Sequence, residues 1–282
     1  MKFLQKAEEI FFRVLMIIAS LVVMGSLGSL LLTVLSRGLP YLDWNMISNV
    51  PHGGFYIGRE GGILNAIVGS LYISGGATLL GLLASIPVVL FMNVYLKKNS
   101  GVAHTLRLFA DILFGIPSIV YGAFGFTIMV FFGLKTSLLA GMITVALLIT
   151  PILIRAMDEV VKMTSQELPE AVLSLGATQW ETSKVVLRQA APGLFIALLI
   201  SFGRAIGDAA SVLFTAGYTD AIPTSLSEPA ATLPLAIFFQ LSSPIPEVQG
   251  RAYASALILT MIILLISLVA RFIRKKFLKN IA

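Results

Sequence analysis

The segment at residues 164–193, TSQELPEAVLSLGATQWETSKVVLRQAAPG, is one long polar interruption in a chain that consists mostly of apolar runs. Two helix starts lie inside it, because Thr164 and Thr178 are each followed three residues later by a glutamate, as in a capping box. Gly176 lies between them, and a glycine there can adopt the left-handed conformation that ends a helix. The sequence therefore predicts a short helix, a sharp turn and a second helix that runs on toward Pro192.

The short helix is predicted to be amphipathic, with one apolar side formed by Leu168, Ala171, Val172 and Leu175. Such a side suits the groove of a partner protein. It also suits the surface of a membrane, on which an amphipathic segment can lie. Periodicity alone does not separate these two interpretations.

The composition is that of an integral membrane protein. Of the 282 residues, 57% are hydrophobic and 12% are charged, well below the roughly 25% charged residues of a soluble domain. The chain has no cysteine and only two histidines, far apart in sequence, so we expect no metal site. The net charge of +6 does not indicate a nucleic-acid partner, because the basic residues gather at the ends of apolar runs, where lipid headgroups lie.

The apolar runs predict an all-α membrane protein with six transmembrane helices in a single domain, residues 1–282. A hydrocarbon core requires roughly 20 residues for each span. The predicted spans are residues 14–35, 63–93, 106–132, 137–154, 194–214 and 252–272. In the third span, Pro117 removes one helix hydrogen bond, and Asp111 is expected to pair with Arg107 one turn earlier. A further apolar piece at 230–241 is too short to span and predicts a re-entrant or interfacial helix.

The distribution of basic residues predicts the orientation. One side of the six-span arrangement carries both termini and the connections around 97–107 and 155–188, with 15 lysines and arginines, and the other side carries four. The positive-inside rule assigns the richer side to the cytoplasm. Both termini and the segment 164–193 are therefore predicted to be cytoplasmic, and the connections 36–62 and 215–250 to be extracytoplasmic.

The fifth span contains two opposite charges, Arg204 and Asp208, which are four residues apart and expected on the same side of a helix. Gly203 and Gly207 form a G-x-x-x-G face beside them, which allows close approach of another helix. The pair either neutralises itself inside the bundle or handles an anion. Charges at this depth cost roughly 2.5 to 3.5 kcal/mol each, which favours a function.

The chemistry of this pair suits an oxyanion. The guanidinium of Arg204 has a fork of donors that can engage two oxygens together. The carboxylate of Asp208 can accept a hydrogen bond that hydrogen phosphate donates and that sulfate lacks. The sequence therefore predicts that both residues lie on the path of a protonated oxyanion.

Several short stretches resemble a known family. Glu170-Ala171-Val172-x-x-x-Gly176 is similar to the E-A-A-x-x-x-G loop of ABC importer permeases. GRAIGDA at 203–209 and LFTA at 213–216 resemble the signature of permeases of phosphate-specific ABC importers, with Asp208 in place of the usual glutamate. Further similar stretches are GREGGI at 58–63, IVGSLY at 67–72, GIPS at 115–118 and PTSL at 223–226. The resemblance covers about residues 55–275 and is closer to the A-type than to the C-type permease of that importer.

The resemblance implies the type I ABC importer permease fold in a bacterial or archaeal cytoplasmic (inner) membrane. It implies a heterodimer with a C-type permease, a dimer of ATPase subunits that binds ATP and magnesium, and an extracytoplasmic phosphate-binding protein. This chain would then be a translocation subunit and not itself an enzyme. The predicted substrate pathway contains Arg204 and Asp208, and also Arg59 and Glu60 if the glycine-rich stretch 58–62 lies at a pore mouth rather than forming a flexible turn before the next span. The implied ATPase-coupling helix contains Glu170, Ala171, Leu175 and Gly176.

Other functions stay open at this point. A permease for another oxyanion, such as molybdate or sulfate, would follow if Asp208 has no part in substrate choice. An ion-coupled secondary transporter would need no ATPase and is favoured by inverted repeats with broken helices, of which the sequence shows no convincing case. In a membrane scaffold, Arg204 and Asp208 would only pack the bundle.

Overall fold

A computed structural model describes residues 2–52, 61–96, 100–163 and 167–278, and the regular elements in these ranges are helices. The long and short α-helices are α1 (Lys2–Gly38), α2 (Trp44–Ser48), α3 (Leu64–Leu90), α4 (Gly101–Phe114), α5 (Ser118–Phe131), α6 (Leu138–Met163), α7 (Glu167–Ser174), α8 (Gln179–Ile206), α9 (Leu233–Leu241) and α10 (Pro246–Leu278). A 3-10 turn η1 (Leu39–Tyr41) follows α1, and a π-helical turn η2 (Phe91–Tyr95) continues α3. The predicted all-α class is confirmed for the described residues.

The helices α1, α3, α6, α8 and α10 are each long and apolar enough to cross a membrane. The pair α4 and α5 meets the same test together, but the two helices are bent by 93° at the break between them. The predicted six spans therefore correspond to five long helices and one bent pair. The sides on which the termini and connections lie stay a prediction.

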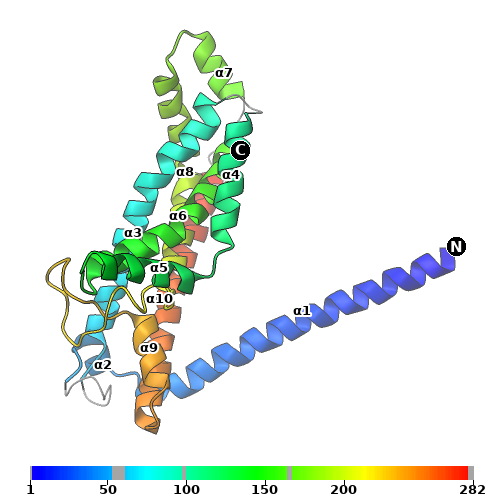
Figure 1. Cartoon of the computed structure of the whole chain (residues 1–282). Coiled ribbons are helices and arrows are strands. Elements are labelled where there is room, and N and C mark those ends of the chain that lie inside the picture. The colour runs from blue at the N-terminus through cyan, green and yellow to red at the C-terminus, as the bar shows by residue number, and fades with distance from the viewer. Residues whose placement is uncertain (1, 53–60, 97–99, 164–166, 279–282) are drawn as a thin grey trace.

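The bundle is elongated, with α7 at one end and α2 and α9 at the other (Figure 1). We call these the α7 end and the α9 end. Helix α1 leaves the bundle near the α9 end and extends away from it, so that its N-terminus lies far from the other helices (Figure 1). At the junction, Gly38 packs so closely on α10 that an added β-carbon would lie 2.6 Å from the carbonyl oxygen of Tyr253.

The core of the bundle forms around α6. Val145, Ile149, Leu153 and Met157 are spaced four residues apart, so they lie on one face of the helix, and all four are fully buried. This face packs against α3, where a β-carbon at Gly81 would lie 2.9 Å from a methyl group of Leu153. The close approach of α3 and α6 gives the bundle a rigid centre on which α8 and α4 are positioned.

The prediction for the third span was wrong in two respects. The chain does not continue as one kinked helix at Pro117, because this residue is the N-cap of the new helix α5 after the 93° turn. Asp111 does not pair with Arg107 but with Arg155 of α6, at 2.8 Å. Arg107 instead binds Asp158 of α6 at 2.9 Å, because that buried carboxylate needs a cation more than the exposed Asp111 does.

The prediction for the fifth span was wrong about its ends. The capped helix after the coupling turn and the apolar run are one helix, α8, which contains Pro192 and ends at Ile206. Gly207 is its C-cap, and residues 208–216 are irregular, with turns at 210–216, rather than the predicted helix. The reason is local: the side chain of Asp208 accepts the backbone N–H of Ser211, which competes with a helical hydrogen bond.

Candidate functional site

The turn between α7 and α8 forms as the sequence predicts. Gly176 has φ +83°, the left-handed conformation that side chains other than glycine rarely adopt. Thr178 and Glu181 form the predicted capping box, in which the Thr178 N–H donates to the Glu181 carboxylate at 2.8 Å and the Glu181 N–H donates to the Thr178 hydroxyl at 3.3 Å. The other predicted capping box begins at Thr164, which lies outside the described residues.

Helix α7 lies at the end of the bundle (Figure 1). None of its residues is buried. Glu170 and Ala171 are exposed, and Leu175 is 89% exposed. Leu168 and Val172 are half-buried. The predicted coupling residues thus form an exposed, partly apolar surface beside a rigid turn, which is a shape suited to insertion into a partner.

Arg204 and Asp208 meet as predicted, although at the end of a helix and not in its middle. Arg204 lies in the last turn of α8, and Asp208 follows the C-cap. Arg204 Nη1 donates to Asp208 Oδ1 at 3.0 Å. The Arg204 side chain is 46% exposed and that of Asp208 is 3% exposed, so the guanidinium is the accessible partner of the pair.

The structure adds Ser211 to this pair, a residue that the sequence analysis did not identify. Its backbone N–H donates to Asp208 Oδ2 at 2.9 Å, and its hydroxyl donates to the same oxygen. An aspartate followed three residues later by a serine is a local signal for such a turn. The signal was hidden because residues 209–214 are otherwise apolar and extend the hydropathy of the span.

The two glycines beside the pair differ in their surroundings among the described residues. A β-carbon at Gly203 would meet no atom of the described residues within 4 Å. At Gly207 the nearest atoms would be the Gly203 carbonyl oxygen at 3.7 Å and a methyl of Ile263 at 3.8 Å. Gly207 thus lies beside α10, whereas Gly203 has no neighbour within 4 Å among the described residues, and the packing role of this face stays a prediction. The predicted pathway residues Arg59 and Glu60 lie outside the described residues.

A second charged cluster lies on the side of the bundle where α4, α6 and η2 meet. The carboxylate of Asp158 is 1% exposed and binds Arg107 at 2.9 Å, Lys162 at 2.6 Å and the Asn93 amide at 2.8 Å. We call these four residues the Asp158 cluster. The sequence analysis missed it, because residues 93, 107 and 158 lie on three separate elements and only the fold brings them together.

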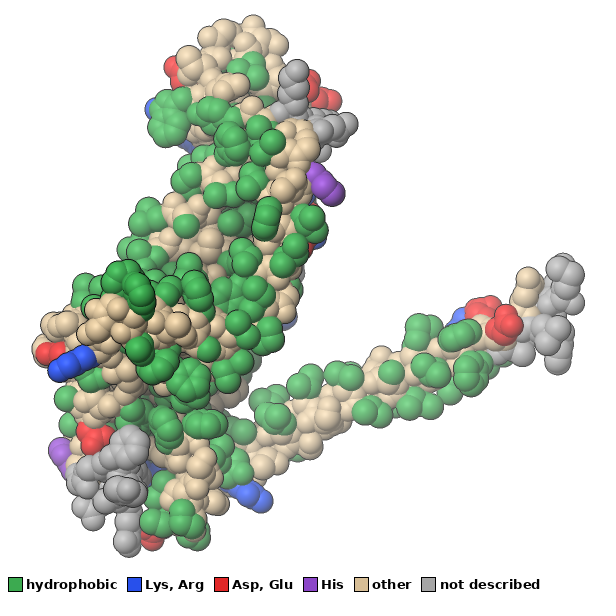
Figure 2. Space-filling view, in the orientation of Figure 1, with side chains coloured by type: hydrophobic (Ala, Val, Ile, Leu, Met, Phe, Trp, Pro, Cys, Tyr) green, Lys and Arg blue, Asp and Glu red, His purple; other side chains and the backbone are tan. Residues whose placement is uncertain are grey.

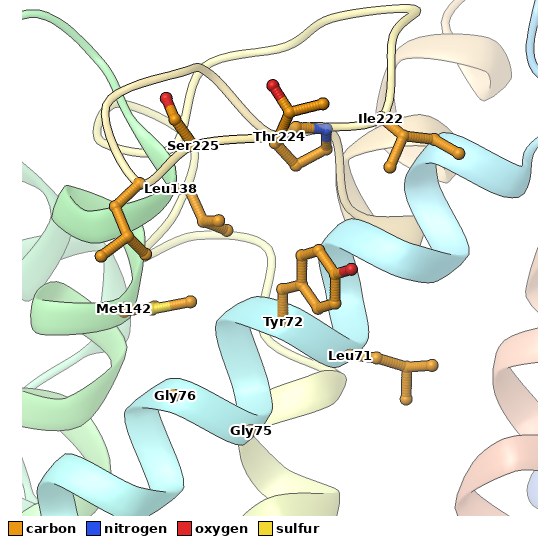
Figure 3. A pocket seen from close by; sticks show the side chains of 11 residues that line it. Leu71, Tyr72, Gly75, Gly76, Leu138, Met142, Ile222, Thr224 and Ser225 are labelled. Atoms are coloured by element: carbon orange, nitrogen blue, oxygen red, sulfur yellow. The ribbon is translucent and has the colours of Figure 1, made fainter.

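A pocket of about 620 Å³ opens between α3, α6 and residues 222–226 (Figure 3). Tyr72, Thr224 and Ser225 supply its hydroxyl groups, and none of its described lining residues is charged. Glu228 holds the adjoining loop, accepting the Thr224 N–H at 2.7 Å. That backbone hydrogen bond is the largest cause of the lowered pKa of Glu228, and the Thr224 hydroxyl lowers it further. Because the pocket has no cation, it is a poorer candidate than Arg204 for recognising an anion.

The sequence is similar to those of known membrane transport proteins. Residues 77–281 match the family described as binding-protein-dependent transport system inner membrane component. The chain is 36% identical over 253 residues to the phosphate transport system permease protein PstA of Yersinia pestis, with 85% of each chain covered. It is 32% identical over 244 residues to the protein of the same name from Xylella fastidiosa, covering 85% of this chain and 83% of that protein.

The fold is similar to that of a solved membrane transporter. A chain of the inward-facing MetNI methionine ABC transporter superposes with a TM-score of 0.62, at 20% sequence identity, covering 76% of this chain and 95% of that chain. This likeness concerns the fold alone. Together with the match over residues 77–281, it leads to one conclusion: the chain belongs to the family of binding-protein-dependent transport system inner membrane components and has the fold of an ABC importer permease.

Proposed function

We propose that this chain is a permease subunit of an ATP-driven importer of inorganic phosphate. The observation that carries the proposal is the Arg204 guanidinium, which is 46% exposed and bound to a buried carboxylate at the end of an apolar helix. The two relatives described above, which are 36% and 32% identical to this chain, are named as phosphate transport permeases. The guanidinium supplies the charge that offsets desolvation of the anion and the donors that fit its oxygens.

The Asp208 carboxylate has one lone-pair site without a donor among the described residues. A carboxylate offers about four lone-pair sites, and here Arg204 and the two donors of Ser211 occupy three of them. A protonated phosphate oxygen fills the remaining site as a donor. Fully ionised sulfate has no such proton, so the same site would select phosphate over sulfate.

A second, C-type permease completes the pathway in this proposal. None of the most apolar 18 residues of α1 is buried in this chain, and the apolar side chains of α1 are bare in Figure 2. Gly25 and Gly28 on this helix have open space around them, as does Gly203 beside Arg204. Small residues on a helix surface allow close approach of a neighbouring membrane helix. We therefore assign the surface of α1 and the Gly203 side of α8 to contacts with the second permease.

The energy source in this proposal is a dimer of ATPase subunits, which binds ATP and magnesium. Helix α7 with Glu170, Ala171, Leu175 and Gly176 is the surface proposed to dock on it. In this account, the α7 end faces the cytoplasm and the α9 end faces an extracytoplasmic phosphate-binding protein, with the bundle in the inner membrane. The distribution of 15 against four basic residues supports this orientation.

The experiment that tests the function uses the complete complex in proteoliposomes. The chain is co-purified with its partner subunits, and uptake of radiolabelled phosphate, sulfate and molybdate is measured with and without ATP on the ATPase side. We expect phosphate uptake that requires both ATP and the binding protein. Uptake of sulfate or molybdate in its place, or phosphate uptake without an ATPase, would contradict the proposal.

A further inference from the structure

The two oxygens of the Asp208 carboxylate have different partners. Oδ1 accepts from Arg204 Nη1 at 3.0 Å, whereas Oδ2 accepts from the Ser211 backbone N–H at 2.9 Å and from the Ser211 hydroxyl. Ser211 is fully buried, and the Asp208 side chain is 3% exposed. The rotation of the carboxylate is therefore fixed from its buried side by Ser211.

This arrangement determines how many donors Arg204 keeps. A guanidinium and a carboxylate often form a fork-to-fork pair, with two parallel hydrogen bonds that engage both oxygens. Because Ser211 holds the second oxygen, Arg204 makes a single hydrogen bond to Asp208 within the described part of the chain. The other guanidinium donors belong to a side chain that is 46% exposed, so they can bind two oxygens of an anion.

Helix α5 keeps Ser211 in position. A β-carbon at Gly122 of α5 would lie 2.8 Å from the carbonyl oxygen of Ala210 and 2.9 Å from that of Ser211, which is closer than real β-carbons approach other atoms. Glycine at this position therefore lets α5 lie directly on the turn that carries Ser211. The backbone of the turn is therefore in close contact with α5 at Ser211 itself.

We propose that Ser211 is a positioning residue for phosphate transport, which holds Asp208 in a single hydrogen bond to Arg204 and so keeps the guanidinium open to the oxyanion. The inference rests on the proposed function. Ser211 acts through Asp208 and does not itself touch the anion. Without its hydroxyl, only the Ser211 backbone N–H holds Oδ2, and the vacated lone pair of that oxygen can accept a second guanidinium donor, which then competes with phosphate for Arg204.

The test compares two variants, Ser211→Ala and Ser211→Cys, in the complete complex reconstituted in proteoliposomes. Cysteine fills the space of serine but donates only weakly, so it separates the loss of the donor from the loss of volume. The matched control is Ser201→Ala, since Ser201 is fully buried on α8 and its hydroxyl has no hydrogen-bond partner among the described residues. The readout is the maximal rate of radiolabelled phosphate uptake per assembled complex.

We expect both Ser211 variants to lower this rate about tenfold, the order expected when a hydrogen bond to a charged group is lost, and the control to keep the wild-type rate. In an Asp208→Asn background, Ser211→Ala should add less than a twofold change, because no anionic oxygen is left to hold. A purely structural serine would show its effect in both backgrounds.

Three results would overturn the inference: a wild-type rate in both Ser211 variants, a loss in Ser211→Ala alone, or failure of both variants to assemble. The proposed function fails separately. The proposed function is contradicted if the wild-type complex takes up no phosphate. Only the role of Ser211 is rejected if the wild-type complex is active, the Arg204→Gln complex is inactive and the Ser211 variants are fully active.

Discussion

The Arg107 guanidinium of α4 binds the buried Asp158 carboxylate of α6 through two nitrogens, with Nε at 2.9 Å from Oδ2 and Nη2 at 3.1 Å from Oδ1. A fork-to-fork pair of this kind fixes geometry as well as adding energy. It ties α4 to the helix that leads directly into the coupling segment. The bent pair α4 and α5 is thereby anchored at the α4 side of its 93° turn.

Removing the buried carboxylate should destabilise the protein strongly. Asp158→Ala leaves the partly buried Arg107 without its counter-ion, whereas Lys162 keeps Glu159 at 3.4 Å. Breaking a buried ion pair costs about 3 to 5 kcal/mol. The control is Asp111→Ala, which breaks the pair with Arg155 between the same two helices; these side chains are 47% and 48% exposed, and an exposed pair contributes about 1 kcal/mol or less. Thermal unfolding in mild detergent measures both. Equal shifts in Tm would show that burial of Asp158 does not matter.

Gly176 should be required for coupling because of its backbone conformation and not because of crowding. Its φ is +83°, while a β-carbon there would meet no described atom within 4 Å. Gly176→Val is therefore expected to leave the complex assembled and to lower the ratio of phosphate taken up to ATP hydrolysed. Gly176→Asn should be milder, since asparagine tolerates the left-handed region. Gly101→Ala is the control, because Gly101 has open space and lacks a positive φ; normal coupling in Gly176→Val would refute the role of the turn.

The coupling turn could be predicted from the sequence, whereas the end of α8 could not. A capping box and a glycine C-cap depend on residues three or four positions apart, so Thr178, Glu181 and Gly176 specify their own geometry. The end of α8 depends on whether the backbone near Asp208 makes helical hydrogen bonds or bonds to the Asp208 side chain. The apolar residues on both sides of Asp208 give no sign of this choice, because the hydropathy of the sequence stays high there. The outcome is decided by hydrogen bonds to Ser211 and by the packing of Gly122, which a hydropathy profile does not contain.

The partners of the charged residues on α4 could not be predicted from the sequence either. Arg107 and Asp111 are neighbours on one helix, so the sequence favours their pairing. In the fold, Arg107 binds Asp158, 51 residues away, and Asp111 binds Arg155, 44 residues away. Which partner each charge binds depends on how α4 packs against α6.

The loop that borders the pocket of Figure 3 should loosen in acid. Hydrogen bonds from Thr224 lower the pKa of the Glu228 carboxyl below its ordinary value of 4.5. Because the pKa of Glu228 is lower in the folded protein than in the unfolded chain, the hydrogen bonds that it accepts from Thr224 stabilise the loop fully above pH 4.5. This stabilisation is lost as the pH falls through the pKa of Glu228 in the folded protein. Amide hydrogen exchange at Thr224 and Ser225, corrected for its intrinsic pH dependence, should therefore accelerate below pH 4.5. In Glu228→Gln, amide exchange at these residues should already be fast at neutral pH and should not accelerate further below pH 4.5. If this variant showed the same pH dependence as the wild type, the Glu228 carboxylate would not be the group that stabilises the loop.

The orientation can be tested with single cysteines, because the chain has none of its own. Lys275→Cys and Lys135→Cys lie at opposite ends of predicted spans. From outside intact cells, a membrane-impermeant thiol reagent should label position 135 and leave position 275 unlabelled until the membrane is opened. Labelling of position 275 in intact cells would reverse the topology and remove the basis for a cytoplasmic α7 end.

The central claim is that phosphate passes the exposed guanidinium of Arg204. The most direct measurement is uptake of radiolabelled phosphate by the complete complex carrying Arg204→Leu and Asp208→Leu together, since apolar residues can replace an ion pair that only holds a bundle together. The account predicts that uptake per assembled complex falls on the order of a hundredfold or more, because the anion loses at least two charge-assisted hydrogen bonds. Uptake is counted per assembled complex because Asp208→Leu also removes the acceptor of the Ser211 donors. Uptake at the wild-type rate would contradict the account and leave Arg204 and Asp208 with a structural role only.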